Sequence, residues 1–186
     1  MNGFVNTGRF NRSLIIGIVL TISFFCVLAA MFLPIWDGSN FLKYADNRFN
    51  ELSKGSVYFV PEIAEEAKKH RGVPLHVKIN VENDKIAEKI AILYSNAGAD
   101  AKAVGSEVVI SGDLGEIIGS ALRDAELGYR NELDGKETLY YWWISLKKIA
   151  KQYKQRGEFD KALFIEKVLT KAIEPAYNFY GIEAKS

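Results

Sequence analysis

The longest uninterrupted apolar stretch of the chain lies near its N-terminus. Residues 13–36 read SLIIGIVLTISFFCVLAAMFLPIW and contain no charged side chain. A helix of this length reaches about 36 Å, enough to cross a hydrocarbon core of roughly 30 Å. The pattern therefore predicts one transmembrane anchor. Its anchoring residues are Ile15, Ile16, Leu20, Phe24, Phe25, Leu28, Phe32 and Trp36.

The charges on either side of this span predict its orientation. Arg9 and Arg12 precede it without an acidic residue, whereas charges of both signs follow it. The positive-inside rule keeps residues 1–12 in the cytoplasm and exports the C-terminal domain to the periplasm or cell exterior. We expect a single-pass protein of the inner (cytoplasmic) membrane.

A cleaved signal peptide is the alternative interpretation of the same segment. Val27-Leu28-Ala29 could serve as its cleavage site. The apolar run is longer than the roughly 7 to 15 residues of a signal-peptide core, which favours a retained anchor. Cys26, the only cysteine, lies inside the span, so no intramolecular disulfide can form. The exported part must be stabilised by packing alone.

Residues 37–56 predict a short juxtamembrane helix. Asn40 can cap its start and Gly55 can end it. We expect the helix to pack on the domain, with the lipid headgroups as the alternative. Its apolar residues at helical spacing are Phe41, Tyr44, Ala45, Phe49 and Leu52.

Residues 57–135 carry the pattern of a small exported α/β unit. The order is β-α-β-β-α after a first helix, which predicts a three-stranded sheet. Asp113 and Glu116 stand at capping-box spacing. The expected elements are a helix from Pro61, a strand over 75–81, a helix over 84–96, a hairpin across Gly105-Ser106 and a helix after Asp113.

Residues 136–186 predict an antiparallel helical hairpin followed by an aromatic tail. Its helices cover about 137–156 and 158–174, with a break at Gly157 and an end at Pro175. The fold class is therefore α+β: an N-terminal transmembrane helix, a small β-α-β-β-α unit and a C-terminal α-helical hairpin. We expect residues 57–186 to form one compact domain.

The hairpin resembles a single tetratricopeptide repeat. The matching residues are Leu146, Ile149, Ala150, Tyr153, Gly157, Phe159 and Ala162. The resemblance departs from the pattern at Glu166, Leu169 and Pro175, and such arrays need about three stacked repeats. It implies similar hairpin packing and a protein-binding surface, not catalysis. Residues 107–113 (EVVISGD) resemble a strand of the lipid-associated BON domains.

Aromatic residues cluster in the C-terminal part. The tetrad Tyr140, Tyr141, Trp142 and Trp143 covers more than one face of a helix, so its members cannot all point into one core. Tryptophan and tyrosine are enriched at protein interfaces. We interpret the tetrad as a partner-binding surface, with an entirely internal core as the alternative. The tail aromatics predicted to join it are Tyr177, Phe179 and Tyr180.

No residue pattern points to catalysis or to a cofactor. His70 and His76 lack the converging ligands of a metal site, and the carboxylate pairs such as Glu65-Glu66 fit a solvated surface. Bases outnumber acids between Lys147 and Lys171, which permits contact with anionic lipid headgroups. The net charge of +1 and the exported location disfavour nucleic acid.

The combined pattern predicts a non-enzymatic envelope protein. We expect an accessory or assembly subunit of a larger membrane complex, which docks other membrane-complex proteins through its aromatic helical hairpin. The alternative is a membrane-tethered sensory or ligand-binding module, and an enzyme with an unrecognised site is the third class. No cofactor is expected.

Overall fold

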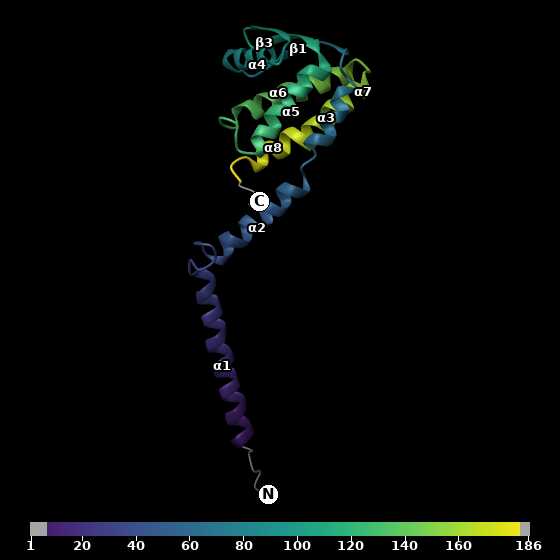
Figure 1. The fold of residues 1–186 in the computed structure, drawn as a ribbon. Coiled ribbons are helices and arrows are strands. Elements are labelled where there is room, and N and C mark those ends of the chain that lie inside the picture. Colours follow the sequence, from purple (N-terminus) through teal and green to yellow (C-terminus); the bar gives the residue numbers. More distant parts are fainter. Residues whose placement is uncertain (1–6, 183–186) are drawn as a thin grey trace. The chain divides into compact units, whose positions relative to one another are not determined.

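The computed structural model of the protein describes residues 7–182 (Figure 1). The chain divides into two compact units, Met1–Phe49 and Asn50–Ser186. Residues 1–6 of the predicted cytoplasmic tail (residues 1–12) lie outside the described residues, and so does the chain after Ile182.

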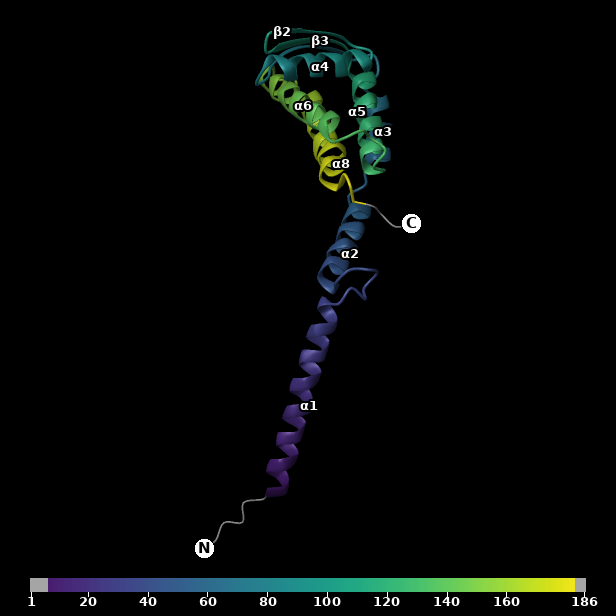
Figure 2. The ribbon, with the colours of Figure 1, turned by 90° about the vertical axis from the view of Figure 1, so that its left-hand side faces the viewer.

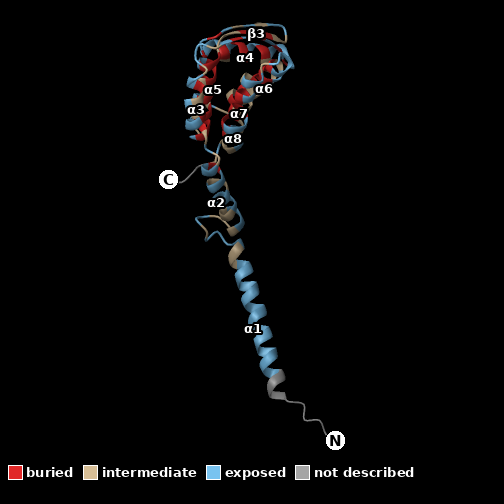
Figure 3. Ribbon diagram, turned by 90° about the vertical axis from the view of Figure 1, so that its right-hand side faces the viewer, coloured by how far each residue is buried: buried red, intermediate tan, exposed pale blue. Residues whose placement is uncertain are grey.

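Helix α1 (Thr7–Phe32) contains the apolar stretch. Its side chains are exposed from residue 11 to residue 29 (Figure 3). The stretch Asn11–Phe32 is long and apolar enough to cross a membrane. This property is consistent with a membrane anchor or with a signal sequence. The helix ends at Phe32 rather than Trp36, because Pro34 disfavours helical backbone at the residue before it.

Trp36 instead lies in the turn that follows α1. Its indole N–H donates to the carbonyl of Ala30 across 3.2 Å, and its backbone pairs with Ser39 in both directions. The ring packs edge-on against Phe41, with centroids 5.0 Å apart, and also contacts Tyr44. The turn is thereby fastened to the last turns of α1.

Helix α2 (Phe41–Ser56) forms where the juxtamembrane helix was predicted, and Asn40 caps its first turn. Within the second unit, Leu52 from its apolar face is exposed. Lys54 is buried instead, and its ammonium donates to the carbonyl of Ile182 across 2.5 Å. At this end of the helix, the polar side and not the apolar face contacts the domain.

The second unit confirms the predicted β-α-β-β-α order. Asn83 and Asp113 cap the two long helices, each accepting a backbone N–H from the first turn. The hairpin turns at Gly105-Ser106, where Gly105 has a φ of +60°. The elements are α3 (Val60–Lys68), β1 (Pro74–Asn80), α4 (Asp84–Asn96), β2 (Asp100–Val104), β3 (Glu107–Asp113) and α5 (Leu114–Tyr129).

The predicted helical hairpin is formed by α6 (Glu137–Gln155) and α7 (Phe159–Val168), which contact each other. Gly157 turns the chain between them with a φ of +76°. Ala150 and Ala162 are both buried, consistent with a close approach of the two helices.

The sequence predicts that the second helix of the hairpin ends at Pro175, but the chain continues as a helix past this residue. A π-helical turn, η1 (Leu169–Ile173), leads directly into α8 (Glu174–Phe179), which carries the proline in its first turn. A proline is tolerated there because its missing N–H is not needed at the start of a helix. The wider turn lets the chain continue past it.

The strands form an antiparallel sheet in the order β1-β3-β2 (Figures 1 and 2). One face is apolar and buried, and α4 lies against it, with α6 in contact with α4 (Figure 2). The inner helix faces and this sheet face share one core (Figure 3). Its sheet residues are Leu75, Val77, Ile79, Val108 and Ile110.

The free edge of β1 is covered by side chains of Gln152 on α6 and of Arg156, the C-cap residue of that helix. The amide of Gln152 donates to the carbonyl of Lys78 across 2.8 Å, and Arg156 donates to the carbonyl of His76 across 3.0 Å. These bonds stand where a neighbouring strand would pair. The hairpin and the α/β unit are thus joined by hydrogen bonds as well as by the core.

Candidate functional site

An open groove lies between α6 and α8. Its cavity volume is about 330 Å³. Mostly aromatic side chains line it, together with one carboxylate and one amide, and three of the lining residues belong to the predicted partner-binding set. The lining residues are Tyr140, Trp143, Glu174, Tyr177 and Asn178.

Contacts between the helices hold the rings of the groove in place. Trp143 donates its indole N–H to the carboxylate of Glu174 across 2.9 Å. The ring of Tyr140 stacks on that of Trp143, with centroids 6.4 Å apart and 22° between the planes. The ammonium of Lys147 lies 4.5 Å from the centre of the Trp143 ring, at cation–π distance. Trp143 is thus fixed from three sides while remaining partly exposed.

Tyr177 and Tyr180 are arranged by the loop before α6. The ammonium of Lys136 lies 5.1 Å from the Tyr177 ring and 5.8 Å from the Tyr180 ring. The Tyr180 hydroxyl donates to the carbonyl of Leu133 and accepts the backbone N–H of Gly135. Tyr180 therefore holds the tail to the domain, whereas Tyr177, 37% exposed, is available at the groove.

The structure divides the predicted aromatic set. Trp142 is fully buried, so its ring belongs to the core and not to a contact surface. Tyr141 and Phe179 are half-buried and do not line the groove. The cause is the rotation of about 100° per helical residue, which turns Trp142 inward when Trp143 faces the groove.

Trp142 takes part in a buried polar arrangement. Its indole N–H donates to the carboxylate of Asp124 across 2.7 Å, and its ring packs on that of Tyr94 with centroids 4.9 Å apart. The Tyr94 hydroxyl donates to Ser145 across 3.0 Å. Burial raises the pKa of Asp124, while the bond from Trp142 and the charge of Arg123 oppose the rise. Burial also raises the pKa of Tyr94.

Other residues considered for chemistry have structural contacts. His70 stacks on Phe164, with ring centroids 3.9 Å apart, and His76 bonds through Nδ1 to Ser111 across 2.7 Å. Glu65 pairs with Lys68, and Glu66 with Lys167. Among residues 7–182, no group of three or more His, Cys, Asp or Glu could hold a metal ion.

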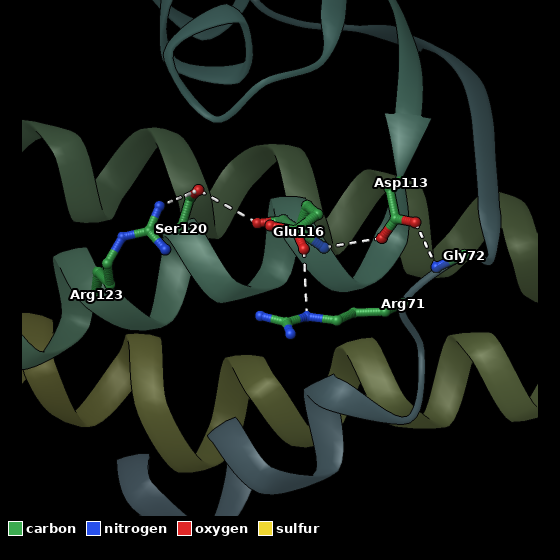
Figure 4. Close-up of polar contacts among 6 residues, drawn as sticks. All are labelled: Arg71, Gly72, Asp113, Glu116, Ser120 and Arg123. Atoms are coloured by element: carbon green, nitrogen blue, oxygen red, sulfur yellow. Dashed lines mark hydrogen bonds and ion pairs between the residues drawn. The ribbon is translucent and has the colours of Figure 1, made fainter.

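Asp113 acts as a cap at the start of α5 (Figure 4). Its carboxylate accepts the backbone N–H groups of Glu116 and Gly72. The predicted capping box is only half formed, because the Glu116 carboxylate pairs with Arg71 at 3.2 Å. The cluster ties α5 to the chain before β1, and Arg123 extends it by donating to Ser120 (Figure 4).

Three of the eight basic residues between Lys147 and Lys171 form ion pairs inside the domain. Lys154 pairs with Glu166 at 2.5 Å, and Lys161 pairs with Glu158 at 2.6 Å. Lys167 bonds to both Glu62 and Glu66 of α3, which raises the pKa of its ammonium. The charge available to lipid headgroups is correspondingly reduced.

The sequence did not indicate two of the groove residues, Glu174 and Asn178. Both follow η1, and the register in which they reach α6 is set by that π-helical turn. The spacing of apolar residues carries no signal for such a turn. The adjacent Pro175 was the one available hint, because a proline inside a helical pattern requires some adjustment of the helix.

No family model, curated protein or solved structure matches the chain. The hairpin shares small buried residues and a glycine turn with the tetratricopeptide pattern, but Phe159 is exposed. The similarity to such a repeat stays a prediction.

Proposed function

We propose that the protein is a single-span membrane protein that docks another membrane-complex protein through the groove between α6 and α8. It acts as an accessory or assembly subunit and is not itself an enzyme. The apolar stretch Asn11–Phe32 supports the anchor. The orientation of the span, with the domain on the exported side, rests on the arginines before it.

One observation carries the proposal: Trp143 is held in a fixed orientation yet left partly exposed beside two tyrosines. Rigid aromatic side chains with a polar tip are the residues that contribute most to protein interfaces. A ring that is already immobilised loses little entropy on binding. The groove accommodates one or a few side chains of a partner rather than a whole helix.

The test is the recovery of a stoichiometric partner with the full-length protein, extracted from its native membrane in mild detergent and weighed as an intact complex. Trp143→Ala and Tyr177→Ala should remove the partner. Phe159→Ala is the matched control, because Phe159 is a large exposed aromatic outside the groove. A monomer or homodimer without a partner contradicts the proposal, as does equal loss in the control.

A second candidate is a ligand-binding module that uses the same groove. The specific observation is its volume, about 330 Å³, at the lower end of the roughly 300 to 1,000 Å³ of small-molecule sites. The carboxylate of Glu174 beside aromatic faces suits an organic cation. Thermal unfolding with a panel of soluble ligands separates the two, since a docking subunit gives no shift.

A further inference from the structure

Helix α2 has a sharply divided surface. At about 100° per residue, its apolar side chains occupy one arc and its polar side chains occupy the other. The apolar arc contains Phe41, Leu42, Ala45, Phe49 and Leu52. The opposite arc contains Lys43, Asn47, Asn50 and Lys54.

The exposure of these side chains is the reverse of that in a core-packed helix. Leu42 and Phe49 in the first unit are 58% and 70% exposed, and Leu52 in the second unit is 71% exposed. Lys54 on the opposite arc is only 6% exposed, since its ammonium bonds to Ile182 within the second unit. Large apolar side chains that share one exposed helix face mark a surface for contact with another apolar surface.

The start of α2 is held at the end of α1. Only residues 33–40 separate the two helices. Trp36 closes this link by bonding to Ala30 of α1 and packing on Phe41 and Tyr44 of α2. If α1 crosses the bilayer, the first turns of α2 are therefore confined to the bilayer surface.

We propose that α2 lies in the membrane interface, with Leu42, Phe49 and Leu52 inserted at the boundary between headgroups and acyl chains. The inference rests on the membrane span of the proposed function. Amphipathic helices bind in this way through buried apolar area, aided by charge where the polar side is basic. The charges of α2 are mixed, Lys43 and Arg48 against Asp46 and Glu51, so apolar contact dominates and neutral lipid suffices.

The bilayer is favoured over a protein as the covering surface by the tether. If α1 is inserted, α2 lies next to the bilayer in every copy of the protein. A partner or a second copy would first have to bind there.

The experiment places a fluorescent label on single cysteines in the full-length protein, reconstituted in phosphatidylcholine vesicles. Leu42→Cys, Phe49→Cys and Leu52→Cys report the apolar arc, in a Cys26→Ala background. Lys43→Cys and Asn47→Cys are the matched controls from the polar arc. Each label is quenched separately by nitroxide-labelled lipid and by aqueous iodide. Native Cys26, labelled alone, reports whether α1 is inserted.

We expect several-fold stronger quenching by the lipid nitroxide at positions 42, 49 and 52 than at the controls, with the opposite order for iodide. Equal iodide quenching on both arcs, with Cys26 in lipid, overturns the α2 proposal alone. Protection of the apolar arc from both quenchers also overturns it, because a protein then covers the face. Iodide access to Cys26 overturns the anchor and the α2 proposal together.

Discussion

Trp143 on α6 donates its indole N–H to Glu174 on α8 across 2.9 Å, and Glu174 is the first residue after the π-helical turn η1. A π-helical turn holds more residues than an α-helical turn, so it rotates the residues that follow it around the helix axis. That rotation determines that Glu174, Tyr177 and Asn178 face α6 and line the groove. The turn that accommodates Pro175 is therefore also the feature that builds the candidate site.

The two adjacent tryptophans are expected to respond differently to truncation. Trp142→Ala should lower the free energy of unfolding by about 3 to 5 kcal/mol, because it leaves a cavity in the core. It also leaves the Asp124 carboxylate without its donor. Trp143→Ala should cost less, about 1 to 2 kcal/mol, because it loses one hydrogen bond and the contacts of a half-buried ring. Urea unfolding of the detergent-solubilised chain measures both; equal losses would contradict the assignment of Trp142 to the core.

Two glycines of α5 form a matched pair with opposite expected effects. A Cβ at Gly115 would lie 2.6 Å from the backbone nitrogen of Arg71, so Gly115→Ala should destabilise the domain by about 1 to 3 kcal/mol. A Cβ at Gly119 would meet no atom within 4 Å. Gly119→Ala should therefore stabilise the helix by roughly 0.5 to 1 kcal/mol. The midpoint of thermal unfolding should fall for the first variant and rise for the second; a shift of the same sign in both would be inconsistent with the tight packing of α5 on the chain at Arg71.

Local features of the fold were predictable from the sequence, and long-range ones were not. The caps Asn83 and Asp113 and the turn at Gly105-Ser106 depend on neighbouring residues only, and all three are confirmed. The inward position of Trp142 depends on how α6 meets α4, which no local spacing contains.

The groove shows the same limit. Its aromatic residues could be predicted from the clustering of tyrosine and tryptophan in the sequence. The positions of Glu174 and Asn178 depend on the π-helical turn. The sequence left open whether the apolar face of α2 packs on the domain or lies at the lipid headgroups, and Leu52 of that face is exposed. The pattern of apolar positions does not distinguish a protein core from a lipid surface as the covering layer.

Removing the cover from the edge of β1 should weaken the domain and expose a pairing surface. Gln152→Ala leaves the backbone groups of Lys78 without partners and should cost about 0.5 to 1.5 kcal/mol. Arg156→Ala should cost a similar amount through His76. Because Arg156 also bonds to Gln152, the two losses should not add. Urea unfolding of the two single variants and the double variant provides the energies.

Association at that edge is the second readout. An uncovered, regular edge strand can pair with the same strand of another copy. Analytical ultracentrifugation should therefore detect concentration-dependent association of the double variant but not of Lys151→Ala, a control at an exposed position of the same helix. Unchanged stability and unchanged sedimentation would show that the side-chain bonds to β1 neither stabilise the domain nor protect its edge from association.

The pH dependence of stability should contain a contribution from Asp124. Its pKa is raised in the folded protein above the ordinary 3.8, with burial as the largest cause. The folded state therefore binds this proton more tightly than the unfolded chain does, and the residue's contribution to stability increases as pH falls through its raised pKa. That contribution is fully present below pH 3.8 and is lost as the pH rises toward neutrality.

Asp124→Asn isolates this effect, because the amide oxygen can still accept the indole N–H of Trp142 while the titrating group is gone. The unfolding free energy of the wild type minus that of the variant should become more positive as the pH is lowered from 7 to 4. At neutral pH the variant should be at least as stable as the wild type, since it carries no buried charge. A difference that stays constant over this range would mean that burial does not raise the pKa of Asp124. A difference that declines toward pH 4 would mean that the bond from Trp142 outweighs the burial and lowers its pKa.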